Sequence, residues 1–118
     1  MFKIRDTGTI GLGVFTTKKL NRGVLVGEVC LKGVKPYINA GRLIHDDWCE
    51  THPLGRYINH SSNSNCDIVQ LNDVIDLVTN QFVKIEEELT MNYFDIARMI
   101  NIPEELWEEY FYTEGIFK

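Results

Sequence analysis

The run Arg-Tyr-Ile-Asn-His-Ser at residues 56–61 constrains the fold of this chain more than any other part of the sequence. An aromatic and an aliphatic residue lead directly into an amide, an imidazole and a hydroxyl, and a polar tail follows at residues 62–66. Polar groups beside a buried apolar segment need hydrogen-bond partners, because an unpartnered buried polar group costs free energy. The run therefore lies either in a solvated loop or against a ligand, and its own residues leave both alternatives open.

Most of the chain predicts short strands. Strand-like patterns occur at residues 2–5, 14–17, 24–31, 66–70, 74–79 and 81–84. Residues 32–54 lack a clear period, and so long a segment in a compact domain tends to be a functional insert; within it we expect a short helix at residues 40–48. The three acids at residues 86–88 predict a solvated turn, after which alternate residues at 89, 91 and 93 share one strand face. The fold class is mostly β with short helices.

The C-terminal part is expected to be helical. Residues 95–100 predict one or two turns, and Pro103 with the two glutamates after it marks a second helix start, where proline and acids are favoured. An apolar stripe at helical spacing follows at Leu106, Trp107, Tyr110 and Phe111. Most such stripes belong to a core. Because this one is aromatic and close to the C-terminus, a lid or a dimer contact is the alternative.

Composition limits the classes of protein to consider. The 118 residues are 44% hydrophobic and 25% charged, which is typical of one ordinary globular domain. No run approaches the about 20 apolar residues of a membrane helix. Residues 1–6 lack the apolar centre of a secretory signal. We therefore expect an intracellular protein that is neither secreted nor membrane-bound.

The net charge of −5 is divided unevenly along the chain. Residues 1–42 hold eight Lys and Arg against two acids, whereas residues 86–114 hold nine acids against one base, Arg98. An acidic half disfavours direct binding of nucleic acid and suits a basic peptide. The alternative is that these acids only keep an exposed helix face in water, and the sequence leaves the two interpretations equal.

The cysteines and glycines exclude two kinds of site. Cys30, Cys49 and Cys66 are far apart, and with only three histidines to help them we expect reduced, separately packed thiols and no zinc. The glycines at residues 8–13 do not have the spacing of a dinucleotide or phosphate-binding loop. They do allow close approach of a ligand and positive φ, and a simple β-turn is the alternative.

Three motifs stand in one order along the chain: Gly-Leu-Gly-Val-Phe at residues 11–15, Arg-Tyr-Ile-Asn-His-Ser at 56–61 and Glu-Glu-Leu-Thr-Met-Asn-Tyr at 87–93. Together they resemble the SET-domain protein lysine methyltransferases, over about residues 8–93. The short length, without pre-SET or post-SET cysteine clusters, is similar to the small stand-alone SET proteins of viruses. If the source is viral, we expect the protein in the host cytoplasm or nucleus.

This resemblance implies a fold and a division of the chain. The fold would be the β-clip type, with small sheets and a threaded, pseudoknot-like C-terminal segment that brings the Asn-His-Ser run beside Tyr93. Residues 1–118 would form a single SET domain with its core at 1–94. The helical segment 95–118 would act as a lid or a dimer contact, and a homodimer is a further expectation.

The family transfers a methyl group from S-adenosylmethionine to the ε-amine of a lysine and leaves S-adenosylhomocysteine. The residues expected at the cofactor are Gly11, Leu12, Gly13, Arg56, Tyr57, Asn59 and His60. The glycine backbone would lie against the methionine part, the Asn-His pair would hold polar groups, and adenine would rest near His60 and Trp107. No metal is expected.

Tyr93 matches the catalytic tyrosine of the family. A phenol with a pKa of about 10 is protonated at neutral pH, so it orients groups by donating a hydrogen bond and is a poor base. The expected walls of the substrate channel are Tyr57, Met91, Tyr93, Tyr37 and Trp48. Met91, which has no hydroxyl, suggests room for more than one methyl. The partner would be a basic protein segment presenting lysine, such as a histone tail or a host DNA-binding regulator, with no nucleic acid or membrane.

Two positions depart from the family pattern, and three rivals stand beside the methyltransferase. Ser62 replaces a cysteine that joins a zinc site in many relatives, and Glu86 replaces a glycine, at a conformational cost if the turn is left-handed. Asn-His-Ser also matches a glycosylation sequon, but no signal peptide precedes it. A hydrolase built on His60 and Ser61 lacks a nucleophile elbow. The third alternative is a SET-like module that binds peptide or cofactor without turnover.

Overall fold

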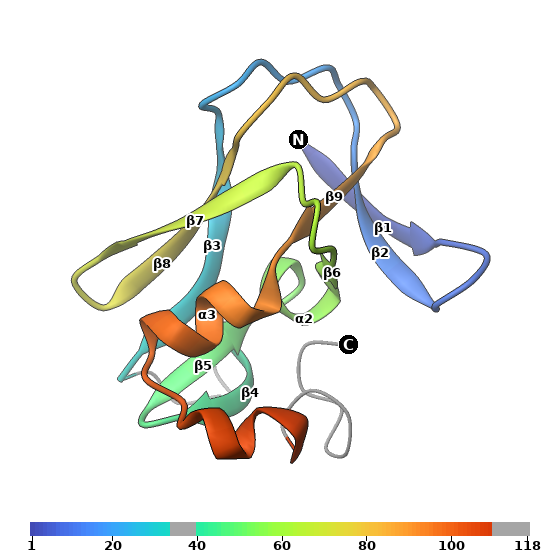
Figure 1. The fold of residues 1–118 in the computed structure, drawn as a ribbon. Helices are drawn as coiled ribbons and strands as arrows, with labels where there is room; N and C mark the ends of the chain where they lie inside the picture. Colours follow the sequence, from blue (N-terminus) through green and yellow to red (C-terminus); the bar gives the residue numbers. More distant parts are fainter. Residues whose placement is uncertain (34–39, 110–118) are drawn as a thin grey trace.

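The computed structural model describes residues 1–33 and 40–109 of the chain (Figure 1). The strands are β1 (Phe2–Asp6), β2 (Leu12–Thr16), β3 (Leu25–Lys32), β4 (Ala40–His45), β5 (Trp48–Thr51), β6 (Asn59–His60), β7 (Cys66–Leu71), β8 (Val74–Thr79) and β9 (Glu88–Met91). The helices are α2 (Leu54–Tyr57), α3 (Tyr93–Met99) and the 3-10 helix η1 (Glu104–Leu106). The prediction of a mostly β fold with short helices is confirmed. Among these residues, no helix is long and apolar enough to cross a membrane.

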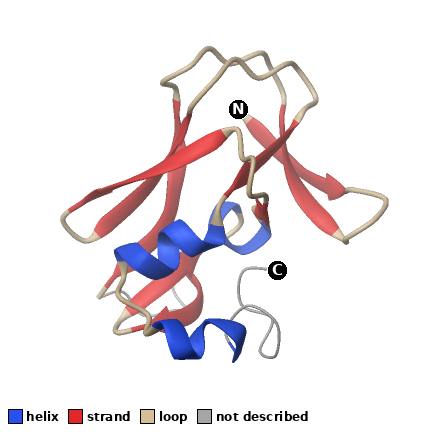
Figure 2. Cartoon of the chain, in the orientation of Figure 1, coloured by secondary structure: helices blue, strands red, loops and turns tan. Residues whose placement is uncertain are grey.

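Two sheets diverge from each other, and the helices gather at the lower end of the view, beside β4 and β5 (Figures 1 and 2). One sheet has the order β1-β2-β9-β6 and the other β4-β5-β3-β8-β7. Strands β6 and β9 pair in parallel, with Asn59 opposite Thr90 and His60 opposite Met91. A parallel pair needs a long crossover, which the β7–β8 hairpin supplies here. Because β9 lies between β2 and β6, the C-terminal strand is flanked by two segments that precede it.

The predicted helix at residues 40–48 is wrong, because this segment forms the β4–β5 hairpin. Asp46 and Asp47 turn the chain with positive φ angles of 48° and 65°, which suit a tight hairpin whose twist matches its strands. Ile44 and Trp48 on either side of the turn are both buried. The usual turn signal includes a glycine, and an Asp-Asp turn lacks it.

The segment before β9 also differs in part from expectation. Residues 81–84 form no strand and contribute only an isolated bridge between Val83 and Leu20. Glu86 has the left-handed φ of 69° that a glycine would adopt more easily. Its carboxylate lies 2.8 Å from Lys3 Nζ and 3.2 Å from Arg5 Nη1. The hydrogen bond from Lys3 is the main cause of a lowered pKa at Glu86, so β1 holds this exposed turn by charge.

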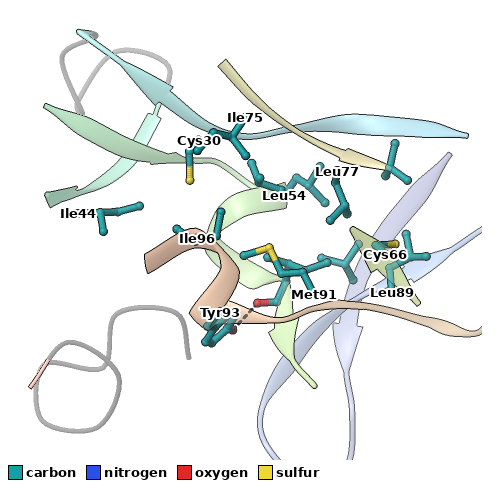
Figure 3. Packing of buried hydrophobic residues seen from close by; sticks show 14 of the residues in the cluster. Cys30, Ile44, Leu54, Cys66, Ile75, Leu77, Leu89, Met91, Tyr93 and Ile96 are labelled. Carbon is teal, nitrogen blue, oxygen red and sulfur yellow. Dashed lines mark hydrogen bonds between the residues drawn. The ribbon is translucent and has the colours of Figure 1, made fainter. Parts of the chain in front are cut away.

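One hydrophobic core joins both sheets to α3 (Figure 3). The predicted strand face is buried at Leu89, Met91 and Tyr93, although Tyr93 already begins α3. Ile96 and Ala97 of α3 are also buried, so the packed interior continues past residue 94. The consequence for function is that Tyr93 is fixed where β9 meets a packed helix.

The three cysteines are part of this interior. Cys30, Cys49 and Cys66 are all buried. Burial raises the pKa of Cys66 to about 12 and also raises the pKa of Cys30 and Cys49. Since the thiolate is the reactive form, these side chains serve packing and are not nucleophiles.

Candidate active site

The parallel β6–β9 pair brings the Asn-His-Ser run against the C-terminal motif. The Tyr93 backbone N–H donates to His60 Nδ1 at 3.0 Å, across 33 positions of sequence. The Ser61 N–H donates to the Met91 carbonyl at 3.0 Å. The Tyr93 hydroxyl donates to the Ile58 carbonyl at 2.5 Å. Two of these hydrogen bonds thus fix the backbone and the phenol of Tyr93 on His60 and Ile58, and the third holds Met91 beside Ser61.

Asn59 connects this pair to the glycine motif. Its side chain is 4% exposed, and Nδ2 donates to the Leu12 carbonyl at 3.0 Å and to Glu88 Oε2 at 2.8 Å. Both amide hydrogens are therefore used inside the protein. One side chain joins β2, β6 and β9, which carry the three sequence motifs.

The two glycines of the first motif act for different reasons. A Cβ on Gly13 would lie 2.5 Å from Glu88 Oε2 and 3.0 Å from Asn59 Nδ2, so close packing requires glycine there. Gly11 has a φ of 92°, and no other atom lies within 4 Å of the position that a Cβ would occupy. Gly11 therefore provides a left-handed turn with open space beside the backbone.

Replacing Asn59 with aspartate should destabilise the fold in a pH-dependent way. The change puts a second carboxylate beside Glu88, and such a pair raises the pKa of one member. We expect a loss of about 1–3 kcal/mol at pH 7, because a good donor becomes a repelling acceptor. The loss should shrink as the pH falls and the raised carboxyl gains a proton that it can donate.

Urea denaturation at pH 7 and at pH 5 measures this effect. Asn63→Asp is the matched control, because Asn63 is exposed in the polar tail. An Asn59→Asp loss that equals the control, or that does not change with pH, would contradict the Asn59–Glu88 contact.

A row of aromatic rings extends from Tyr93 along the C-terminal segment. The His60 ring lies 5.1 Å from the Tyr93 ring and 5.4 Å from Phe94, measured between centroids. The Phe94 ring lies 5.4 Å from Trp107, whose Nε1 donates to the Ile102 carbonyl at 2.8 Å. Phe94 therefore lies between His60 and Trp107 in this row. His60 and Trp107 are the two residues near which the adenine ring was expected.

Two titratable groups of this site keep their neutral forms. Burial lowers the pKa of His60, with Asp95 opposing the shift; a neutral imidazole also agrees with Nδ1 accepting the Tyr93 N–H. Tyr93 is 5% exposed, and burial followed by the charge of Glu50 raises its pKa. The phenol therefore keeps its proton, donates a hydrogen bond and is a very poor base.

Arg56 takes a place that the sequence did not suggest. Its Nε lies 3.7 Å from Oε1 of Glu50, a fully buried carboxylate that also receives Arg42 Nε at 2.9 Å. Its guanidinium lies 5.5 Å from the Tyr57 ring. Among the described residues, Glu50 Oε2 has no hydrogen-bond partner. The Arg56 side chain thus links α2 to the β4–β5 hairpin.

The expected channel residues that the structure describes are spread over four elements, β9, α3, α2 and β5. Met91 and Tyr93 are buried side chains of the same core, and Tyr57 of α2 packs against it. Tyr57 meets the His52 ring edge-on at 5.6 Å. Trp48 is buried in β5, with Lys32 Nζ 6.0 Å from its ring centroid. Tyr37 lies outside the described residues.

Three residues of the site were missed. Glu88 was expected in a solvated turn but accepts from Asn59. Asn65 Nδ2 donates to the Glu88 carbonyl at 2.9 Å, and Asn65 Oδ1 accepts from the Thr90 N–H at 3.0 Å. With one donor and one acceptor, this asparagine amide makes the two hydrogen bonds to β9 that the backbone of a neighbouring strand would make. Phe94, the third, directly follows the tyrosine, and its aromatic character was the only available signal.

Two features of this site could hold a nucleoside-bearing cofactor. The open space beside Gly11 suits a ligand chain that follows the backbone, and the aromatic row that begins at the exposed His60 ring suits a flat base. Within residues 1–33 and 40–109, no group of three or more His, Cys, Asp or Glu side chains is placed to hold a metal ion.

Comparison with known proteins agrees with this fold. A family model, the SET domain, matches residues 11–94. A search of curated proteins found no significant match. Among solved structures, 185 chains match. One is a crystal structure of a Plasmodium falciparum protein named "putative histone methyltransferase", with 16% identity, a TM-score of 0.54, and coverage of 78% of this chain and 91% of that chain.

At 16% identity the structural match concerns the fold alone. The family model, however, spans most of the chain and contains all three motifs. The SET-type architecture expected from those motifs is confirmed, and this chain belongs to the SET domain family.

Proposed function

We propose that this protein is an S-adenosylmethionine-dependent protein-lysine N-methyltransferase. SET domains are generally protein lysine methyltransferases, which supports the reaction class. The observation that carries the proposal is the convergence of three distant motifs through direct hydrogen bonds. The Asn59 amide donates to the Leu12 carbonyl, and the Tyr93 N–H donates to the His60 ring. A module that had only to bind a peptide would not need a buried tyrosine at this junction.

The cofactor would be held by residues on both sides of Asn59. Gly11 and Leu12 present an exposed backbone turn, and the His60 ring offers a flat surface near Phe94. S-adenosylmethionine supplies, when bound, a methyl group on a positively charged sulfur. The Asn59 amide already bonds within the protein, so we assign it to shaping the site, with backbone groups next to it available for the ligand.

Tyr93 would orient the reacting amine by accepting a hydrogen bond at its phenol oxygen, because its one proton is donated to the Ile58 carbonyl. Its phenol stays protonated because burial raises its pKa, so it does not remove the proton of the substrate lysine. That lysine has a reference pKa of about 10.4, and a dry channel disfavours its charged form. Positioning then supplies much of the rate. Met91 contributes an apolar wall without a hydroxyl, which we take to allow more than one methyl.

For the partner we propose a Lys/Arg-rich protein segment, such as a histone tail or a host DNA-binding regulator. The support is the excess of acids in residues 86–114. A relationship to the small viral SET proteins, a host-cell location, and a lid or dimer role for residues 95–118 belong to the same proposal. At the start of this segment, Ile96 and Ala97 of α3 are buried in the core.

A ligand-induced shift in melting temperature tests the cofactor. S-adenosylmethionine and S-adenosylhomocysteine should each stabilise the folded state by about 2.7 kcal/mol at 100 times Kd, which is about 10 °C for a domain of this size. Methionine alone is the matched control ligand. The absence of any shift at millimolar S-adenosylhomocysteine would contradict the proposal.

A further inference from the structure

A groove between β7 and α3 has no part in the reaction described above. It has a volume of about 460 Å³ and is lined by Asp67, Ile68, Asp95, Arg98 and Met99. Figure 1 shows α3 running below the β7–β8 hairpin. The groove begins where α3 leaves Tyr93.

We propose that this groove is a specificity subsite that binds a basic side chain of an extended peptide substrate, next to the target lysine. The inference rests on the proposed function and names the feature of the substrate that the site selects. Three independent features of the groove carry it: its carboxylates, its apolar floor and its position at the edge of a sheet.

The first feature is a carboxylate on each wall. Asp67 Oδ1 accepts from Asn80 Nδ2 at 2.9 Å, and Asp95 Oδ1 pairs with Arg98 Nη1 at 3.1 Å. Within the described residues, the second oxygen of each acid takes part in no hydrogen bond or ion pair. Arg98 also lies 5.5 Å from the Trp107 ring, so it is held on the helix side. The groove therefore keeps a net negative charge that suits one added cation.

The second feature is the apolar floor. Ile68 of β7 and Met99 of α3 line the same groove as the two acids and are only partly buried. Lysine and arginine side chains place their methylene stems on apolar surface while their charged ends reach polar groups. An apolar lining beside two carboxylates suits a lysine or arginine side chain and disfavours an acidic side chain.

The third feature is the strand edge. β7 is the last strand of its sheet among the described residues, and an edge strand can pair with an extended peptide. Two of its apolar side chains, Val69 and Leu71, are 51% and 69% exposed. Main-chain pairing would give affinity, and the groove would select the side chain.

The distance from Tyr93 sets the register of the subsite. Residues Asp95 to Met99 lie about 3–9 Å along the helix axis from Tyr93 at about 1.5 Å per residue. An extended peptide advances about 3.3 Å per residue. A peptide extended alongside α3 from Tyr93 would therefore place the selected basic residue about one to three positions from the target lysine.

Peptide binding tests the subsite without requiring turnover. The probe is a fluorescent extended peptide with one central lysine flanked by arginines, measured by anisotropy together with S-adenosylhomocysteine. The double variant Asp67→Asn with Asp95→Asn should weaken binding about tenfold, since two partly exposed ion pairs are lost. The same peptide with alanine in place of the arginines should bind wild type and variant equally.

The matched control is Asp73→Asn with Asp76→Asn, which removes the same charge from the β7–β8 hairpin outside the groove. Equal weakening of peptide binding by both double variants would show that only the net charge of the protein matters and would overturn the subsite. No weakening by Asp67→Asn with Asp95→Asn would also overturn it. Thermal melts of both variants establish that each is folded.

Kinetics separate this inference from the proposed function. With methyl transfer as readout, the groove variant should raise KM for the arginine-flanked peptide about tenfold at nearly constant kcat. Turnover that is unaffected by the variant supports the methyltransferase and overturns the subsite. Groove-dependent binding without turnover by the wild-type protein supports the docking surface and contradicts the proposed reaction.

Discussion

Replacing Gly55 with alanine should lower the free energy of unfolding by about 3 kcal/mol or more, at the upper end of what overpacking a core costs. A Cβ at this position would lie 2.1 Å from the Val29 carbonyl oxygen and 2.9 Å from Thr51 Oγ1. The first of these atoms is the backbone of β3, a central strand of the larger sheet. It cannot move aside as a flexible side chain would.

The same contact explains how α2 is placed. Thr51 Oγ1 donates to the Glu28 carbonyl at 2.6 Å and accepts from the Gly55 N–H at 2.9 Å. Gly55 is thus held against β3 by a hydrogen bond and by the lack of a side chain. Because α2 leads directly into Asn59 and His60, a displaced α2 would also distort the site.

Urea denaturation followed by circular dichroism measures the Gly55→Ala effect. Gly23→Ala is the matched control: Gly23 has a φ of 86° and nothing within 4 Å of its Cβ direction, so alanine there costs only about 1–2 kcal/mol of left-handed strain. If Gly55→Ala is no more destabilising than Gly23→Ala, the packing of α2 on β3 is wrong.

Replacing Tyr93 with phenylalanine should reduce methyl transfer by about 10²–10³-fold, a loss of the size that follows removal of one oriented hydrogen-bonding group from an active site. Binding of S-adenosylhomocysteine should be unchanged, because the ring and its packing on His60 remain. The lost hydrogen bond to the Ile58 carbonyl should cost about 1 kcal/mol of stability. Equal turnover by both proteins would contradict the role assigned to the phenol.

The Tyr93 variant also has a pH signature. Burial raises the pKa of this phenol, so in the folded state it keeps its proton at a pH where an unfolded tyrosine, with a pKa of about 10, loses it. The folded state then binds more protons, and its stability falls as the pH rises above about 10. Melting temperatures between pH 9 and pH 11 should therefore fall less steeply for Tyr93→Phe than for the wild type.

Local patterns in the sequence predicted the elements whose signals are local. The β7–β8 pair follows from β-branched residues on both sides of the turn at Asn72, and the burial of Leu89 and Met91 follows from alternation. The hairpin at residues 40–51 was missed because Asp46 and Asp47 adopt positive φ without a glycine to mark it. Their conformation depends on burial of the strands that they connect.

The contacts of the site are likewise of two kinds, those with a local signal in the sequence and those without one. The approach of His60 to Tyr93 was implied by resemblance to a family, and no periodicity in this chain would have predicted it. The hydrogen bond from Asn59 to Glu88 joins residues 29 positions apart. It was not predicted, because an acid in a run of three acids indicates a solvated turn. Arg56 stood in the central motif, yet its charge partner Glu50 lies on a hairpin whose residues 40–48 were expected as a helix. Such partners depend on tertiary packing, which single-sequence patterns do not contain.

Methyl transfer to lysine is the most direct measurement of the central claim. Wild-type protein is incubated with S-adenosylmethionine labelled on its methyl group and with a lysine peptide flanked by arginines, or with a whole-cell extract, and the protein fraction is hydrolysed for amino-acid analysis. We predict label in methyl-lysine for the wild type and only background for Tyr93→Phe. A folded wild-type protein that binds S-adenosylhomocysteine but labels no lysine in either substrate would contradict the methyltransferase and favour a SET-like binding module.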